Sequence, residues 1–170
     1  FGYVDSLWEV TTNPPLLSYY LAPFGALSDF NEMVLHSAMM LFLLLMGWAM
    51  VSLSRRFTPQ TIYWPMLFVM FSCAIMVSGN VMRDVPAAGL ATAGVAFYIR
   101  GTDKRSLGLL FLGATLAGLA ILTKYSAIIV LPLLVLYPFF QRKCAYMFWI
   151  WPTVLIFALW CVHNQIQYGT

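Results

Sequence analysis

Charged residues are scarce in this sequence. Only 9% of its residues are charged and 62% are hydrophobic, whereas an ordinary soluble domain carries about 25% charged residues. A chain with so few charged residues cannot form the hydrated surface of a soluble domain. The composition therefore predicts an all-α integral membrane protein with a polytopic helical bundle. The formal net charge of +3 is not concentrated in one stretch, which argues against nucleic acid as a partner.

Cysteine is also scarce, and the common motifs of soluble enzymes are absent. Cys73, Cys144 and Cys161 lack the spacing of metal ligands, so we expect small packed residues rather than a disulfide or a metal site. The sequence contains no P-loop, Rossmann glycine fingerprint, zinc-protease helix or nucleophile elbow. These absences exclude the corresponding soluble-enzyme templates.

Long apolar segments are abundant, and they predict about six transmembrane helices, since one span needs about 20 residues. Residues 1–32 are expected to form an outer-face loop with a juxtamembrane helix, residues 33–163 the transmembrane bundle, and residues 164–170 the start of another outer-face loop. The predicted spans are 33–53, 62–77, 85–99, 107–123, 127–140 and 146–162. The chain starts at Phe1 and stops in a polar stretch, so we expect a fragment of a longer protein that is inactive alone.

The connections between the predicted spans set the expected orientation. Alternate connections place seven basic residues on one side and two, Arg83 and Lys124, on the other. The seven are Arg55, Arg56, Arg100, Lys104, Arg105, Arg142 and Lys143. By the positive-inside rule, the side with seven is cytoplasmic.

The remaining polar residues gather on the opposite, outer side. They are Asp5, Glu9, Asn13, Asp29, Glu32, Asn80, Arg83, Asp84, Lys124, Tyr125, His163, Asn164 and Gln165. Charged groups near a membrane are costly, and they tend to be paired or functional. The outer face is therefore where we expect a site.

Asp84 is the principal candidate in this set. It precedes Pro86 at the mouth of the third span, where a helix N-terminus stabilises a carboxylate. The sequence leaves two interpretations open, namely a simple N-cap or a catalytic or substrate-binding role. Arg83 can pair with Asp84, bind an anionic headgroup or reach the membrane interface.

Lys124 and His163 are weaker candidates. Lys124 departs from the positive-inside pattern, so it is either an interfacial lysine or a phosphate-binding one. His163 lies at an outer helix end, and the spacing of its neighbours does not support a metal site. The prolines Pro132, Pro138 and Pro152 fall inside the last two predicted spans and are expected to kink them.

The segment Asn13-Pro14-Pro15-Leu16 predicts a shaped turn outside the bilayer. Pro14 fixes its own φ, and Pro15 favours an extended conformation for Pro14. Pro15 can also begin a helix, because the first helical position needs no N–H. The segment therefore indicates an extended approach to an amphipathic helix at the membrane surface.

Three segments together resemble one family of membrane enzymes. They are Thr12-Asn13-Pro14-Pro15-Leu16 with Tyr19-Tyr20, Val81-Met82-Arg83-Asp84-Val85-Pro86, and Gly118-Leu119-Ala120 with Leu122-Thr123-Lys124-Tyr125. In order, spacing and shared face they resemble the GT-C glycosyltransferases of the dolichyl-phosphate-mannose protein mannosyltransferase type, including bacterial lipid A aminoarabinose transferases.

The resemblance implies roles for single residues. Asn13, Pro14 and Pro15 match a Pro-Pro-Leu segment, Asp84 matches a second acidic residue, and Lys124 matches a lysine ahead of a later span. We expect Asp84 to be catalytic, and the principal catalytic acid of the family to lie upstream of Phe1. Substrate-binding positions are then Asn13, Pro14, Pro15, Arg83, Lys124 and Tyr125.

The implied activity is sugar transfer from a polyprenyl-phosphate donor to a protein, lipid or glycan acceptor on the periplasmic or lumenal side. The sugar is a hexosyl or mannosyl group or aminoarabinose, and the expected location is the bacterial inner membrane. No cofactor is required by the pattern, and a divalent metal, for which His163 is a weak candidate, stays open. The alternative is a polytopic transporter or lipid flippase, but such a protein should place its charges near the bilayer midplane.

Overall fold

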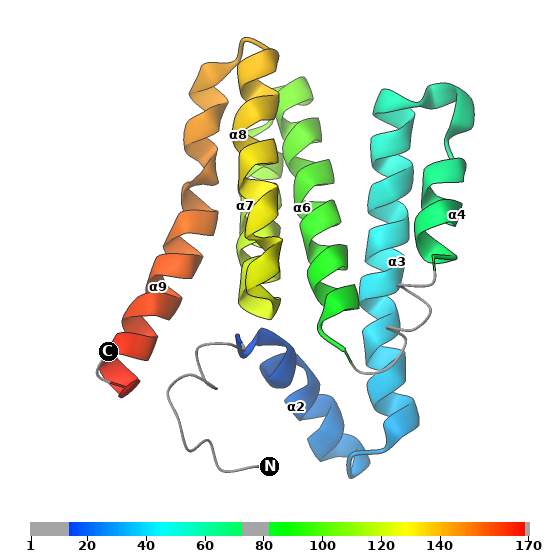
Figure 1. Cartoon of the computed structure of the whole chain (residues 1–170), viewed down its shortest axis with the longest axis vertical. Coiled ribbons are helices and arrows are strands. Elements are labelled where there is room, and N and C mark those ends of the chain that lie inside the picture. Colours follow the sequence, from blue (N-terminus) through cyan, green and yellow to red (C-terminus); the bar gives the residue numbers. More distant parts are fainter. Residues whose placement is uncertain (1–13, 73–81, 169–170) are drawn as a thin grey trace.

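The computed structural model describes residues 14–72 and 82–168 (Figure 1). Within these ranges the chain forms helices and no strand. The α-helices are α2 (Leu16–Ser28), α3 (Glu32–Phe57), α4 (Trp64–Met70), α6 (Asp84–Lys104), α7 (Leu107–Thr123), α8 (Val130–Phe140) and α9 (Trp151–Tyr168). Short 3₁₀ segments, η1 (Pro59–Thr61), η2 (Tyr125–Ile129) and η3 (Cys144–Ile150), lie between them.

The long helices run alternately in opposite directions, which gives the bundle two distinct ends (Figure 1). At the upper end in this view lie the turns that follow α3, α6 and α8. At the lower end lie α2, the start of α6 and the end of α7. Residues 40 positions apart in the sequence can therefore meet at one end.

Polar and charged residues stabilise both ends of helix α3. The side chain of Asn31 accepts a hydrogen bond of 2.9 Å from the amide of Met33, and Glu32 occupies the first turn. Arg55 and Arg56 occupy the last turn, where positive charge is favourable to the helix dipole. These features fix both ends of a 26-residue helix.

The packing of α6 against α7 forms the centre of the bundle, and glycine allows it. A Cβ on Gly94 would lie 2.9 Å from the amide nitrogen of Ala117, and one on Gly113 would lie 2.5 Å from that of Tyr98. Small residues at such crossings let helix backbones approach closely. Ala114 and Ala117 between them are fully buried.

Two helical segments in the described residues are long and apolar enough to cross a membrane, Glu32–Phe57 and Cys144–Ile166. Only 33% and 11% of their apolar windows are buried. Their large exposed side chains, Leu155 and Leu159 among them, fit a lipid surface better than water. The chain is thus an all-α membrane protein, as its composition predicts.

The six predicted spans compare unevenly with these helices. Helix α7 covers the same residues as the fourth predicted span, 107–123. Like Tyr125–Phe140, however, it is an apolar helix shorter than the two segments that are long enough to cross a membrane. The second predicted span, 62–77, contains the seven-residue helix α4, and its last residues fall outside the described ranges. Its Pro65 lies in the first turn, so the helix begins only after a 3₁₀ turn.

The expected effects of three prolines are partly wrong. Pro132 lies in the first turn of α8 and Pro152 in the first turn of α9, where a missing N–H costs nothing. Both prolines therefore begin helices, after the 3₁₀ segments η2 and η3, instead of kinking them. Pro138 alone lies in the interior of its helix.

Candidate functional site

An ion pair between Asp84 and Lys124 joins two helix ends at the lower end of the bundle. The Nζ of Lys124 donates to the Oδ1 of Asp84, across 40 positions of sequence. Both side chains stay half exposed, at 49% for Asp84 and 43% for Lys124. A charged pair of this exposure is open to a ligand.

The local backbone explains how the two side chains meet. Asp84 is the first residue of α6, and Arg83 occupies the N-cap position without a side-chain cap bond. Lys124 directly follows α7 in an extended conformation, with φ −154° and ψ 124°. Asp84 is therefore not the N-cap, one of the two interpretations left open by the sequence, and its carboxylate is turned to Lys124 instead.

A cleft of about 230 Å³ adjoins this pair. Asp84 and Lys124 line it together with Ser126, and small or aliphatic residues of α6, η2 and α8, such as Ala88 and Val130, form the rest. The cleft thus has a charged, hydroxyl-bearing edge and an apolar interior. Such a combination suits a ligand that is partly polar and partly lipid-like.

Arg83 lies beside Asp84 and has an unused donor. Its Nη1 atom is buried, and it has no hydrogen-bond partner within the part of the chain that the structure describes. A buried guanidinium nitrogen without an acceptor is costly. The atom is enclosed by protein, and Arg83 does not line the cleft beside Asp84.

Tyr125 and His163 contact the same aromatic residue of α9. The Nε1 of Trp160 donates a hydrogen bond of 2.8 Å to the Tyr125 hydroxyl, and the ring of His163 stacks on Trp160 with centroids 5.5 Å apart. Neither residue lines the cleft beside Asp84. Tyr125 thus braces the start of η2 against α9.

No group of three or more His, Cys, Asp or Glu side chains that could hold a metal occurs in residues 14–72 and 82–168. His163 therefore has no set of co-ligands in this part of the chain. A metal role for it stays a prediction without geometric support.

The two prolines shape the entry to α2. Pro14 is fully buried, and Pro15 is the N-cap, so the helix begins one residue later than predicted, at Leu16. Asn13 lies outside the described residues. Pro14 and Pro15 do not line the cleft beside Asp84.

Helix α2 is fastened to the bundle by Tyr20. Its hydroxyl donates a hydrogen bond of 2.9 Å to the carbonyl oxygen of Ala38 on α3, and its ring meets Phe42 with centroids 4.8 Å apart. Burial raises the pKa of the Tyr20 phenol above its ordinary value. The phenol therefore stays a neutral donor.

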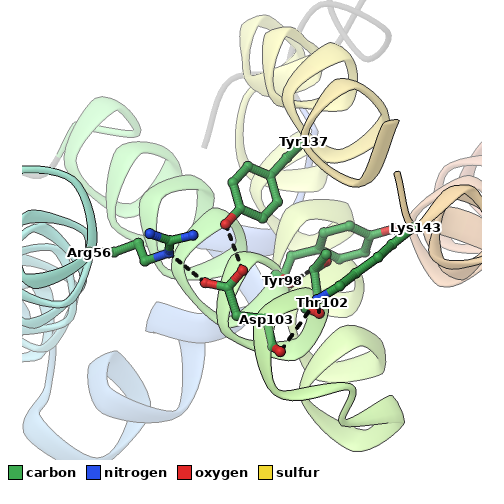
Figure 2. Close-up of polar contacts among 6 residues, drawn as sticks. All are labelled: Arg56, Tyr98, Thr102, Asp103, Tyr137 and Lys143. Atoms are coloured by element: carbon green, nitrogen blue, oxygen red, sulfur yellow. Dashed lines mark hydrogen bonds and ion pairs between the residues drawn. The ribbon is translucent and has the colours of Figure 1, made fainter. Parts of the chain in front are cut away.

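A second polar cluster, which the sequence interpretation missed, lies at the upper end of the bundle (Figure 2). The carboxylate of Asp103 accepts from the Nε of Arg56 at 2.7 Å and from the Tyr137 hydroxyl at 2.8 Å. Asp103 therefore connects α6 to both α3 and α8.

Lys143 adds a third connection. Its Nζ donates at 2.6 Å to the carbonyl oxygen of Thr102, near the C-terminal end of α6, where a cation stabilises the unpaired carbonyl groups. One signal could have revealed this cluster, since Asp103 is the single acidic residue within Arg100-Gly101-Thr102-Asp103-Lys104-Arg105. Interpreting that segment as a solvated loop concealed it.

Comparison with known proteins gives one finding. Neither the curated proteins nor the solved structures include a match to this chain. A family model described as dolichyl-phosphate-mannose-protein mannosyltransferase matches residues 12–166. Since that match covers most of the sequence and confirms the resemblance of its three motifs, the chain belongs to the dolichyl-phosphate-mannose-protein mannosyltransferase family of membrane glycosyltransferases.

Proposed function

We propose that the protein transfers a sugar from a polyprenyl-phosphate donor to an acceptor hydroxyl, with Asp84 and Lys124 at the reacting centre. The observation that carries this proposal is the half-exposed ion pair of these two residues beside a partly apolar cleft. Membership of a mannosyltransferase family supports a sugar as the transferred group. The apolar part of the cleft supports a lipid-linked donor.

The proposed topology places this pair on the outer face of the bacterial inner membrane, in a bundle of about six spans. The seven basic residues lie near the C-terminal ends of α3 and α6 and in the connections after α6 and α8, which share one end (Figure 1). The Asp84 end contains Arg83 and Lys124 as its basic residues within the described ranges. This asymmetry favours a cytoplasmic location for the basic end.

The proposed reaction is a single displacement at the anomeric carbon. The acceptor hydroxyl oxygen forms a bond to that carbon while the bond from carbon to phosphate oxygen breaks. The hydroxyl proton passes to a carboxylate, for which Asp84 is the candidate in this chain. The polyprenyl phosphate leaves with the bonding electron pair, and Lys124 and Arg83 stabilise its negative charge.

The ion pair has a role in this scheme before the donor binds. Lys124 neutralises Asp84 in the empty site, and a donor phosphate competes for the same ammonium group. Transfer of Lys124 to the phosphate frees the carboxylate for the acceptor hydroxyl. Arg83, which precedes Asp84 in the chain, is the candidate for a second donor to the phosphate once its side chain moves toward the cleft, which it does not line.

The test is transfer of radiolabelled sugar by the full-length protein in proteoliposomes. Polyprenyl-phosphate mannose and polyprenyl-phosphate aminoarabinose are assayed as separate donors, because the geometry does not select between them. We expect Asp84→Asn and Lys124→Gln each to lower transfer by about 10²-fold or more, the usual effect of losing a general base or a charge-stabilising donor.

Two matched variants control for the loss of charge. Asp29→Asn removes a carboxylate from the exposed C-cap of α2, where asparagine tolerates the left-handed backbone, and Lys104→Gln removes an exposed lysine at the opposite end of α6. Both should retain the parent rate. Parent activity in Asp84→Asn would remove Asp84 from the mechanism, and lipid movement without sugar transfer would support a flippase instead.

A further inference from the structure

An apolar groove of about 370 Å³ lies between α3, α6 and α8, towards the upper end of the bundle. Leu53 of α3, Val95 and Ile99 of α6 and Leu133 of α8 are among the eight residues that line it. Tyr137 is the single lining residue with a polar side chain. The volume falls within the range of about 300–1,000 Å³ that is usual for small-molecule sites.

One end of this groove meets the Asp103 cluster. The Tyr137 hydroxyl donates to Asp103, and Asp103 accepts from Arg56, the neighbour of the lining residue Phe57. The Arg56 side chain remains 47% exposed in spite of this bond. A guanidinium that an outside ligand can reach therefore lies next to the groove, beside its lining residues Phe57 and Tyr137.

The surroundings of Arg56 are strongly basic. Seven basic residues, Arg56 among them, and one acidic residue, Asp103, lie near the C-terminal ends of α3 and α6 and in the connections after α6 and α8. An apolar slot that ends at a basic membrane surface matches a molecule with an apolar chain and an anionic head. A planar guanidinium suits the oxygens of a phosphate.

We propose that this groove binds an anionic phospholipid, with one acyl chain between α3, α6 and α8 and the phosphate at Arg56. The site is distinct from the Asp84 end, and its occupancy does not depend on sugar transfer. Anionic lipids are enriched in the cytoplasmic leaflet, and a basic protein surface attracts them. The lipid would connect three helices that the Asp103 cluster also connects.

The test uses the full-length protein in bilayers of mixed lipid. A phosphatidylglycerol probe with a photoreactive group on one acyl chain is compared with a phosphatidylcholine probe that has the same chain, and labelled peptides are mapped. We expect phosphatidylglycerol to label the peptide of α8, Val130–Phe140, about fivefold more than phosphatidylcholine, the effect of one arginine near an anionic lipid.

Charge variants test the head of the lipid. The double variant Arg56→Gln/Asp103→Asn removes the cation without leaving a lone carboxylate, and it should abolish the preference for phosphatidylglycerol. Arg100→Gln is the matched control, because Arg100 lies over the Trp48 ring at 5.6 Å and neither residue lines the groove. It should keep the preference.

A packing variant tests the acyl chain without touching the polar cluster. The Leu133→Trp side chain fills the groove from an exposed position. It should lower the labelling of α8 by both probes about threefold or more. Leu112→Trp, the same change on the exposed face of α7 outside the groove, should leave labelling unchanged. Equal labelling by the two probes in the parent protein would overturn the proposal. So would an unlabelled α8, as expected if another helix or a second copy covers the groove.

Discussion

The crossing of α6 and α7 depends on glycine at position 113, and replacement by alanine tests that dependence. A Cβ on Gly113 would lie 2.5 Å from the amide nitrogen of Tyr98 and 2.7 Å from the carbonyl oxygen of Gly94. Ordinary contacts of a Cβ begin at 3.4 Å. Both neighbours are backbone atoms of α6, so no rotamer change relieves the overlap, and the two helices must separate locally.

The magnitude follows from two opposing terms. Overpacking a close-packed interior costs about 1–3 kcal/mol, and rigid backbone neighbours place Gly113→Ala in the upper half of that range. Alanine regains about 0.5–1 kcal/mol over glycine inside a helix. We therefore expect a net loss of about 1–2.5 kcal/mol in the free energy of unfolding.

The assay is reversible unfolding of the purified protein in mixed micelles, followed by far-ultraviolet circular dichroism. Gly108→Ala is the matched control on the same helix, because a Cβ there meets nothing within 4 Å. That control should be as stable as the parent or up to about 1 kcal/mol more stable. If Gly113→Ala proves as stable as Gly108→Ala, the close approach of the two backbones is refuted.

Three further predictions concern single polar contacts, all measured by the same unfolding assay. Asp103→Asn should cost about 1–2 kcal/mol because it weakens two side-chain bonds between helices. Asp84→Asn should cost less than about 1 kcal/mol because the Asp84 side chain is half exposed. Equal losses would contradict this difference between the two carboxylates. Tyr20→Phe should cost about 0.5–1.5 kcal/mol through its lost bond to α3 and should increase proteolysis of α2; an unchanged cleavage rate would count against that fastening. Thr153→Val removes a buried bond of 2.6 Å between α9 and α7 and should cost about 0.6–1.7 kcal/mol, and a neutral result would show that α9 is held by apolar contacts alone.

Helix boundaries were predictable where apolar runs end at polar or helix-ending residues. The segment 107–123 is an example, because its sequence becomes polar at Lys124 and the helix ends there. The boundary after residue 99 was not predictable in the same way. Helix α6 continues to Lys104, since a helix that has left an apolar environment can extend when neighbouring side chains bind its polar last turn.

The sequence also predicted that Asp84 and Lys124 share a face, but not that they touch. Their contact needs α6 and α7 to cross closely enough for side chains 40 positions apart to meet. That distance is set by Gly94 and Gly113, whose packing partners no local pattern specifies. The Asp103 cluster was missed for a related reason, because its partners come from three separate segments.

The two carboxylates of α6 lie at opposite ends of the helix dipole, so one of them needs partners for its stability and the other does not. Asp103 lies at the C-terminal end of the helix, where the dipole disfavours negative charge, so it needs the partners that it has. Asp84 lies at the N-terminal end, where the dipole already stabilises a carboxylate. Lys124 is therefore not required to keep Asp84 in place, and the proposed movement of the lysine to a donor phosphate would cost the fold little. A cation that the fold can release is what a site for an anionic leaving group requires.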